Sequence, residues 1–130
     1  MILDSSVVLA IVLGEPGFEL FVGAIASAPN CRISAASFVE TSIVAEGRAG
    51  EQGLRQCDSF FRTSRVSVEP VTEEQAMLAR QCYSDYGKGR HAAGLNFGDC
   101  FAYALAKVTG EPLLFKGQDF SQTDIQPALS

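Results

Sequence analysis

The chain has few of the residues from which zinc sites and disulfide frameworks are built. Its 130 residues include one histidine, His91, no tryptophan and no pair of cysteines in a C-x-x-C spacing. Structural zinc sites need closely spaced cysteine and histidine ligands, so a zinc site is not expected. The cysteines lie far apart in the sequence, and no secretory context accompanies them. We therefore expect reduced, mostly buried thiols rather than disulfides. The four are Cys31, Cys57, Cys82 and Cys100.

Long apolar runs and a basic excess are also missing. No apolar run is long enough to span a bilayer, and the N-terminal stretch lacks a basic start and is interrupted by Asp4, which is atypical of a signal peptide. We expect a cytoplasmic protein with no membrane contact. The net charge of −5 gives no general indication of nucleic-acid binding. Positive charge gathers only at Lys88, Arg90 and His91, in a glycine-rich loop that either contacts phosphates or is simply solvated.

Short apolar segments alternate with helical patterns along the chain. This alternation predicts an α/β fold with a mainly parallel sheet, formed as a single domain over residues 1–130. The expected strands lie at 1–4, 31–33, 66–68 and 113–115, with a short final one beginning at 124–125. Helices are expected at 5–13 and 18–27, from about 37 with a break between 47 and 53, from 72 onward, and from 97 to 108.

Four carboxylates lie at the boundaries of these elements. Asp4 and Asp119 follow apolar strands, while Glu40 and Asp99 lie near the expected starts of helices. In an open parallel sheet such positions converge on one crevice at the carboxyl ends of the strands. Clustered carboxylates repel one another unless a positive charge lies among them, and a hard divalent cation with oxygen ligands is the usual partner. The four acids therefore predict a metal-dependent active site.

Each acid also has a structural explanation of its own. Ser37 to Glu40 and Asn96 to Asp99 both fit a capping box at a helix start. Asp4 can cap the helix that follows it, and Asp119 can be a turn residue. Two observations favour the metal site: all four acids belong at one edge of the sheet, and Asp99 falls opposite an apolar stripe on its helix. That stripe comprises Phe97, Phe101, Leu105 and Val108.

Four segments resemble the PIN domain and, more narrowly, the VapC-type toxins of bacterial toxin–antitoxin pairs. The resemblance covers nearly the whole chain, and the third and fourth segments are the most specific. The segments are Ile2-Leu-Asp-Ser-Ser6, Ala36-Ser-Phe-Val-Glu40, Asn96-Phe-Gly-Asp-Cys-Phe-Ala-Tyr-Ala-Leu-Ala106 and Leu113-Leu-Phe-Lys-Gly-Gln-Asp-Phe120.

The resemblance implies a three-layer α/β/α sandwich and an endoribonuclease that depends on Mg²⁺ or Mn²⁺. The acidic quartet of the family falls on Asp4, Glu40, Asp99 and Asp119, and its small hydroxyl residue falls on Ser6. We expect a metal-activated water to attack a backbone phosphorus, with Asp4 and Asp99 as direct ligands. Glu40 and Asp119 either bind metal or orient its waters.

Further residues carry weaker expectations. Ser6, Lys116 and Arg90 are candidates for substrate contacts, although each also fits a structural or solvated role. Tyr83, Tyr86 and Tyr103 can stack on bases or pack in the core. Asp124 lies where some relatives have an additional acid, and we expect no essential role for it.

The resemblance also implies partners beyond the RNA substrate. These are a cognate VapB-type antitoxin, whose apolar helix crosses the early helices and whose arginine enters the acidic pocket, and a second copy in a homodimer. Candidate groove positions, which can equally be ordinary core, are Val12, Leu13, Phe18, Phe21, Ile43 and Val44. On this view the chain can also act chiefly as an antitoxin-binding module with a weak nuclease site.

Two other classes fit less well. Haloacid-dehalogenase-like phosphatases need a second aspartate two residues after the first, where this chain has Ser6. A receiver domain needs paired acids after its first strand and a central phosphoryl-accepting aspartate. Here Asp4 stands alone, and no aspartate ends the segment Val66-Ser-Val-Glu-Pro70.

Overall fold

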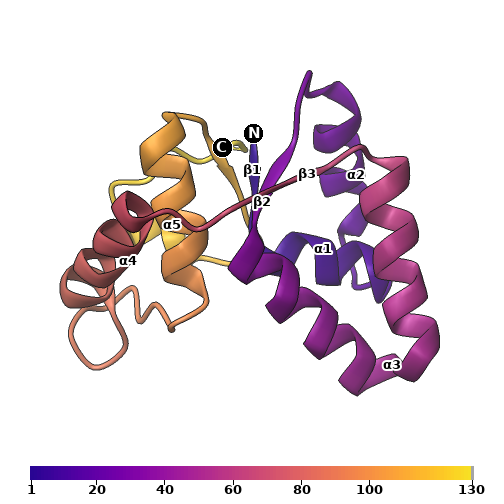
Figure 1. Ribbon diagram of the computed structural model, residues 1–130, viewed down its shortest axis with the longest axis horizontal. Coiled ribbons are helices and arrows are strands. Elements are labelled where there is room, and N and C mark those ends of the chain that lie inside the picture. The colour runs from indigo at the N-terminus through magenta and orange to yellow at the C-terminus, as the bar shows by residue number, and fades with distance from the viewer. Residues whose placement is uncertain (130) are drawn as a thin grey trace.

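The central sheet is parallel throughout and carries helices on both faces (Figure 1). The computed structural model describes residues 1–129. The strands are β1 (Ile2–Leu3), β2 (Arg32–Ser34), β3 (Ser67–Glu69) and β4 (Leu113–Leu114), in the spatial order β3-β2-β1-β4. The helices are α1 (Ser5–Val12), α2 (Phe18–Ser27), α3 (Ala35–Thr63), α4 (Glu73–Tyr86) and α5 (Asp99–Thr109), followed by the 3₁₀ turn η1 (Phe120–Gln122).

Alternate strand residues point to opposite faces of the sheet and enter separate cores. Ile2 and Leu113 pack with α4 and α5, whereas Leu3 and Leu114 pack with α1, α2 and α3. This follows from the two-residue period of a strand, and all four side chains are fully or almost fully buried. The two cores confirm the predicted three-layer α/β/α sandwich, with α4 and α5 on one side and α1 to α3 on the other (Figure 1).

The long helix α3 bends sharply at one glycine. Gly50 has φ 64° and ψ −152°, a conformation that other residues avoid, so the helix consists of two parts on either side of it. This agrees with the predicted break between residues 47 and 53. The four cysteines are free and buried, as expected.

The start of α3 differs from the prediction. The helix begins at Ala35, and its N-cap is Ser34, whose hydroxyl accepts a hydrogen bond from the Ala36 amide at 3.3 Å. Ser37 lies within the first turn, so the predicted capping box between Ser37 and Glu40 is wrong. An extended segment that runs directly into a helix leaves several serines as candidate caps, and the sequence alone did not distinguish them. The Glu40 carboxylate is therefore available for other contacts.

Two further expectations are corrected. The predicted apolar stripe on α5 is wrong at its ends, because Phe97 is 75% exposed and Val108 is 39% exposed, while a continuous run from Ala102 to Ala106 is buried. Such a helix is covered on most of its circumference, which a single-stripe pattern does not describe. The final strand at 124–125 is also not formed; instead Pro127 makes an isolated bridge with Leu113.

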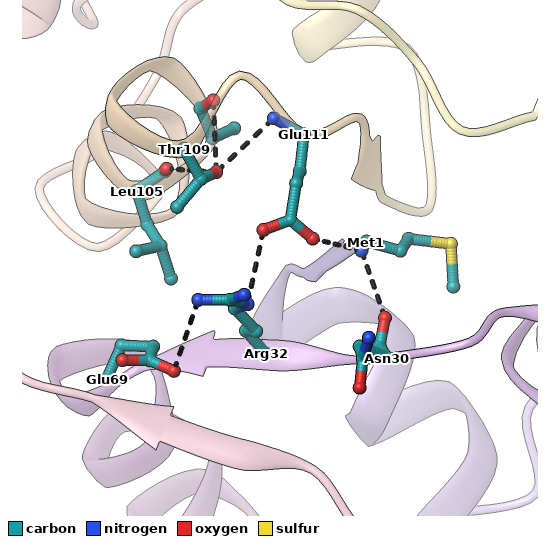
Figure 2. Close-up of polar contacts among 8 residues, drawn as sticks. Met1, Asn30, Arg32, Glu69, Leu105, Thr109 and Glu111 are labelled. Carbon is teal, nitrogen blue, oxygen red and sulfur yellow. Dashed lines mark hydrogen bonds and ion pairs between the residues drawn. The ribbon is translucent and has the colours of Figure 1, made fainter.

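A polar network fixes the beginnings of β1 and β2 (Figure 2). The amino group of Met1 donates to the Asn30 carbonyl at 3.0 Å and to Glu111 Oε1 at 2.5 Å. Arg32 joins the other Glu111 oxygen at 3.2 Å and Glu69 at 3.7 Å. These groups are partly exposed, so the network contributes to strand position more than to stability. It lies at the end of β1 away from Asp4.

Candidate active site

Asp4 lies at the carboxyl end of β1, where it is held by the turn that follows. As the N-cap of α1 it is 4% exposed, and its Oδ2 accepts from the Ser6 amide at 3.1 Å and from the Ser6 hydroxyl at 2.6 Å. The Ser6 hydroxyl in turn accepts from the Lys116 amide at 3.0 Å. Ser6 therefore ties the first acid to the segment that follows β4.

Glu40 reaches the same region from the first turns of α3. Its Oε1 accepts a hydrogen bond from the Ser5 hydroxyl at 2.7 Å, and Ser5 is itself 6% exposed. Ser5 is not among the residues that the sequence pattern singles out. The only sequence signal was a hydroxyl residue between Asp4 and Ser6, and the pattern does not indicate which serine faces Glu40.

Glu40 also lies against the beginning of α5. A Cβ atom built on Gly98 would overlap Glu40 Oε2 and would be 2.7 Å from Oε1. Gly98 precedes Asp99, so this close approach places the carboxylate of Glu40 beside the element that carries the third acid. The contact depends on the absence of a side chain at Gly98, so the pattern of charged residues in the sequence does not indicate it.

Asp99 is oriented by a reciprocal pair of hydrogen bonds. Its Oδ2 accepts from the Asn96 amide at 2.9 Å, and the Asn96 side-chain oxygen accepts from the Asp99 amide at 2.9 Å. This is the predicted capping arrangement between Asn96 and Asp99.

Asp119 is exposed, next to η1. Its charge is the smallest of the contributions that raise the pKa of Asp99.

The protonation of these acids reflects their crowding. Burial, together with the charges of Asp4, Glu40 and Asp119, raises the pKa of Asp99 to about 7, although the hydrogen bond from the Asn96 amide lowers it. Burial likewise raises the pKa of Asp4, although the hydrogen bonds from Ser6 oppose it, and the charge of Glu40 adds to the increase. The four predicted acids thus interact electrostatically in one place.

This cluster has no cation of its own. Across residues 1–129, none of the ion pairs involves Asp4, Glu40, Asp99 or Asp119. The donor set is all carboxylate and hydroxyl oxygen, which suits Mg²⁺ or Mn²⁺ rather than a softer metal. Within the same residues, no three acidic, cysteine or histidine side chains are gathered closely enough to hold a metal ion as they stand.

The candidate substrate residues lie in different settings. Lys116 follows β4, and its ammonium is paired with Glu15 at 2.7 Å, while Arg48 approaches the same carboxylate at 3.6 Å. Arg90 lies in the glycine-rich loop, with its guanidinium 5.4 Å from the centre of the Tyr83 ring. The structure brings Ser6 directly to Asp4, but it gives Lys116 and Arg90 other partners.

Asp124 has partners away from the cluster. It accepts hydrogen bonds from the Tyr103 hydroxyl at 2.6 Å and from the Lys107 ammonium at 2.9 Å. Burial acts to raise the pKa of Asp124, but these hydrogen bonds outweigh it and hold the pKa below its usual value. Its contacts are those of a residue that fixes the end of the chain against α5.

A cavity of about 830 Å³ lies between α1, α2 and the second part of α3. Of the predicted groove positions only Val12 lines it, while Phe21 is core and Ile43, on the first part of α3, is 65% exposed. Its apolar lining comes instead from residues such as Ile11, Val22, Ile25 and Phe60.

The family model of the PIN domain matches residues 1–126. The chain belongs to the PIN domain family. It is 51% identical, over 96% of its length and 97% of the relative's, to a protein named ribonuclease VapC from Mycolicibacterium smegmatis. It therefore falls in the VapC branch of the PIN domains.

Solved structures of this branch share the fold. VapC20 of Mycobacterium tuberculosis, described as a sarcin–ricin loop cleaving toxin, superposes with a TM-score of 0.78 at 20% identity, covering 95% of each chain. A chain of VapBC2 from Rickettsia felis, solved with a promoter DNA fragment, gives 0.76 at 12% identity and covers 97% of this PIN domain and 94% of that chain. Within the described residues of this PIN domain, no helix is long and apolar enough to cross a membrane.

Proposed function

We propose that this PIN domain is a divalent-metal-dependent endoribonuclease and the toxin of a toxin–antitoxin pair. The observation that carries the proposal is a cluster of carboxylates without a counter-charge, in which Asp4 is buried and Ser5 and Ser6 hold Glu40 and Asp4 in place at the carboxyl end of β1. Burial and the crowding of the acids raise the pKa of both Asp4 and Asp99. A site of this kind is electrostatically incomplete until a cation binds. The ribonuclease name of the relative at 51% identity supports RNA as the substrate.

Asp4 and Asp99 are assigned as direct ligands, with Glu40 and Asp119 as ligands or holders of bound water. A bound Mg²⁺ or Mn²⁺ would lower the pKa of water and neutralise charge on the phosphate during attack. The chain's own residues fix the geometry: Ser6 orients Asp4, Ser5 orients Glu40, and Asn96 orients Asp99. Hydrolysis by water leaves a 5′-phosphate and a 3′-hydroxyl.

A VapB-type antitoxin is the partner that we assign to the cavity between α1, α2 and α3. The cavity is long, open and partly apolar, and its lining residues such as Val22 are exposed in the isolated chain. The VapBC2 chain of similar fold comes from a complex of this type. An arginine from the partner would supply the positive charge that the acids lack.

The test is cleavage of total RNA by the purified protein with Mg²⁺, with Mn²⁺ and with EDTA. Asp4→Asn and Asp99→Asn should abolish cleavage, whereas Asp58→Asn, which removes an exposed acid on α3, should not. Calorimetric titration with Mn²⁺ provides a second readout that is independent of turnover. Absence of both metal binding and RNA cleavage in the folded wild-type protein would overturn the proposal.

A further inference from the structure

A small apolar cavity lies between α4 and the beginning of α5. Its volume is about 300 Å³, at the lower end of the range for ligand pockets, so it has room for one planar group. Buried Ala79 and Cys100 lie at its base. Its other lining includes three aromatic side chains, those of Tyr83, Phe97 and Phe101.

Phe97 has no structural reason to be exposed. It is 75% exposed, although it stands directly before Gly98 and Asp99 at the start of α5. Its ring packs edge to face on Phe101 with centroids 4.9 Å apart, which leaves an aromatic face at the cavity. A large ring in this position gains little from folding, so its apolar surface is available to a ligand.

The rim of the cavity is positively charged. Arg80 lines it, and the guanidinium of Arg90 lies over the ring of Tyr83. Across residues 1–129 neither arginine belongs to an ion pair. In a chain of net charge −5, two such guanidinium groups beside an aromatic cavity indicate an anionic, planar partner.

We propose that this cavity is a nucleobase subsite for the RNA strand. A base stacks on Phe97, Phe101 and Tyr83, while Arg80 and Arg90 face the phosphates beside it. Two residues that line the cavity, Phe97 and Cys100, flank Gly98 and Asp99 in the sequence, so the base belongs to a nucleotide close to the cut. Stacking on aromatic rings with arginine at the backbone is the chemistry of single-stranded RNA recognition. The subsite rests on the proposed ribonuclease function and adds base selection to it.

A second copy of the chain fits this cavity less well. A two-fold contact here would bring the same surface of both copies together, including two arginines from each. None of the lining residues is acidic, so nothing in the cavity would neutralise them. The RNA strand supplies that negative charge itself.

The first experiment maps cut sites in a random RNA pool by sequencing the product ends. The wild type should show a base preference at one position beside the cut. Phe97→Ala removes a stacking surface, and Ala76→Leu fills the cavity. In both variants the ratio of cutting at the preferred base to cutting at the other bases should fall by about fivefold or more. Ala49→Leu is the matched control, since it adds the same volume on α3 about 20 Å from the start of that helix.

The second experiment does not depend on cleavage. The four nucleoside 5′-monophosphates are titrated into the isotope-labelled protein in EDTA, and amide shifts are followed by NMR. Shifts at residues 76–83 and 97–101 that weaken in Phe97→Ala support the subsite. If the wild type cuts RNA but shows neither a base preference nor these shifts, the subsite is wrong and the ribonuclease function stands.

The remaining outcomes are also decisive. A wild type that cuts no RNA overturns the proposed function, and the nucleotide titration then still decides whether the cavity binds bases. If Phe97→Ala changes the molecular mass by light scattering and leaves the base preference intact, the surface binds a second copy instead. The subsite is then overturned.

Discussion

Glu40 and Gly98 are in direct contact, although they lie on α3 and at the start of α5, far apart in the sequence. The carboxylate of Glu40 occupies the space that a side chain on Gly98 would fill, with Oε1 2.7 Å from the position of a Cβ and Oε2 closer still. The φ of Gly98 is −63°, which any residue adopts. Glycine is therefore required here for space and not for its backbone conformation.

We expect Gly98→Ala to impair cleavage without unfolding the protein. The atoms that the added methyl group would meet belong to a flexible carboxylate rather than to backbone, so the cost in stability is small. Displacement breaks the bond from Ser5 to Glu40, and we expect kcat/KM for RNA to fall about tenfold or more. Gly47→Ala is the control, because a Cβ at that position meets nothing within 4 Å. Equal activity of the two variants would contradict this role of Gly98.

The pKa of Asp99 predicts how pH affects stability. The group binds its proton more tightly in the folded chain, with a pKa near 7, than in the unfolded chain, where the value is about 3.8. Between these values the folded state holds more protons, so the free energy of unfolding falls as pH rises. Asp99→Asn removes this loss and keeps an acceptor for the Asn96 amide. In metal-free buffer its Tm should exceed that of the wild type at about pH 8 by a few degrees, and by much less at about pH 4.

Asp58→Asn is the control for that comparison, because it removes an exposed carboxylate from α3. It should shift the Tm equally at both pH values. Added Mn²⁺ should raise the Tm of the wild type and leave Asp99→Asn unchanged. If the difference in Tm between the wild type and Asp99→Asn is the same at both pH values, the shift assigned to Asp99 is wrong.

Much of this site follows from the sequence because acids at element boundaries have few places to lie. A parallel sheet brings the ends of β1, β2 and β4 to one edge, so the sequence predicts that Asp4, Glu40 and Asp119 lie near one another. It does not predict their supporting contacts. Ser5 and Ser6 look equivalent in the sequence. Only the folded backbone at the start of α1 shows that Ser5 bonds to Glu40 and Ser6 to Asp4.

The errors on α5 and in the predicted groove share one physical origin. A helix that is buried on most sides, such as α5, obeys no single stripe, and exposed apolar residues such as Phe97 and Ile43 resemble core residues in any pattern. Periodicity reports which residues can be buried together, but not which neighbours cover them. The few large apolar residues that are exposed mark the surfaces where partners are most expected to bind.

The Ser6 hydroxyl links Asp4 to the segment after β4, and its removal should weaken metal binding. Ser6→Ala leaves Asp4 Oδ2 with one hydrogen bond, from the backbone, and leaves the Lys116 amide without its acceptor. Residues that orient a metal ligand typically affect affinity by about 10- to 100-fold, and we expect a change of that size in the Kd for Mn²⁺. Stability should fall by only about 1 kcal/mol.

Two variants separate this role from a general loss of packing. Ser6→Thr keeps the hydroxyl and should restore most of the affinity. Ser42→Ala removes a hydroxyl that bonds only its own helix, at Phe38, and should leave metal binding unchanged. If Ser6→Ala and Ser42→Ala bind Mn²⁺ equally well, Ser6 does not orient the ligand.

Glu15 controls how much of the positive charge near Ser6 is available to RNA. Its two oxygens face Lys116 at 2.7 Å and Arg48 at 3.6 Å, so one negative charge is shared by two cations and restrains both of them, Lys116 more closely. Glu15→Gln releases them, and the apparent affinity for RNA should rise. Each further phosphate that the protein neutralises adds about 0.7 to the slope of log K against log salt for a single strand.

The cation that Glu15 restrains can be identified by combining substitutions. Lys116→Gln alone should change the affinity for RNA little, because the charge of Lys116 is already paired. If Lys116 is the group that reaches phosphate, the double variant Glu15→Gln with Lys116→Gln should lose the increase in RNA affinity that Glu15→Gln shows alone. If the double variant keeps that increase, Arg48 is the group. A salt slope that is the same in the wild type and in Glu15→Gln would place both cations outside the path of the RNA.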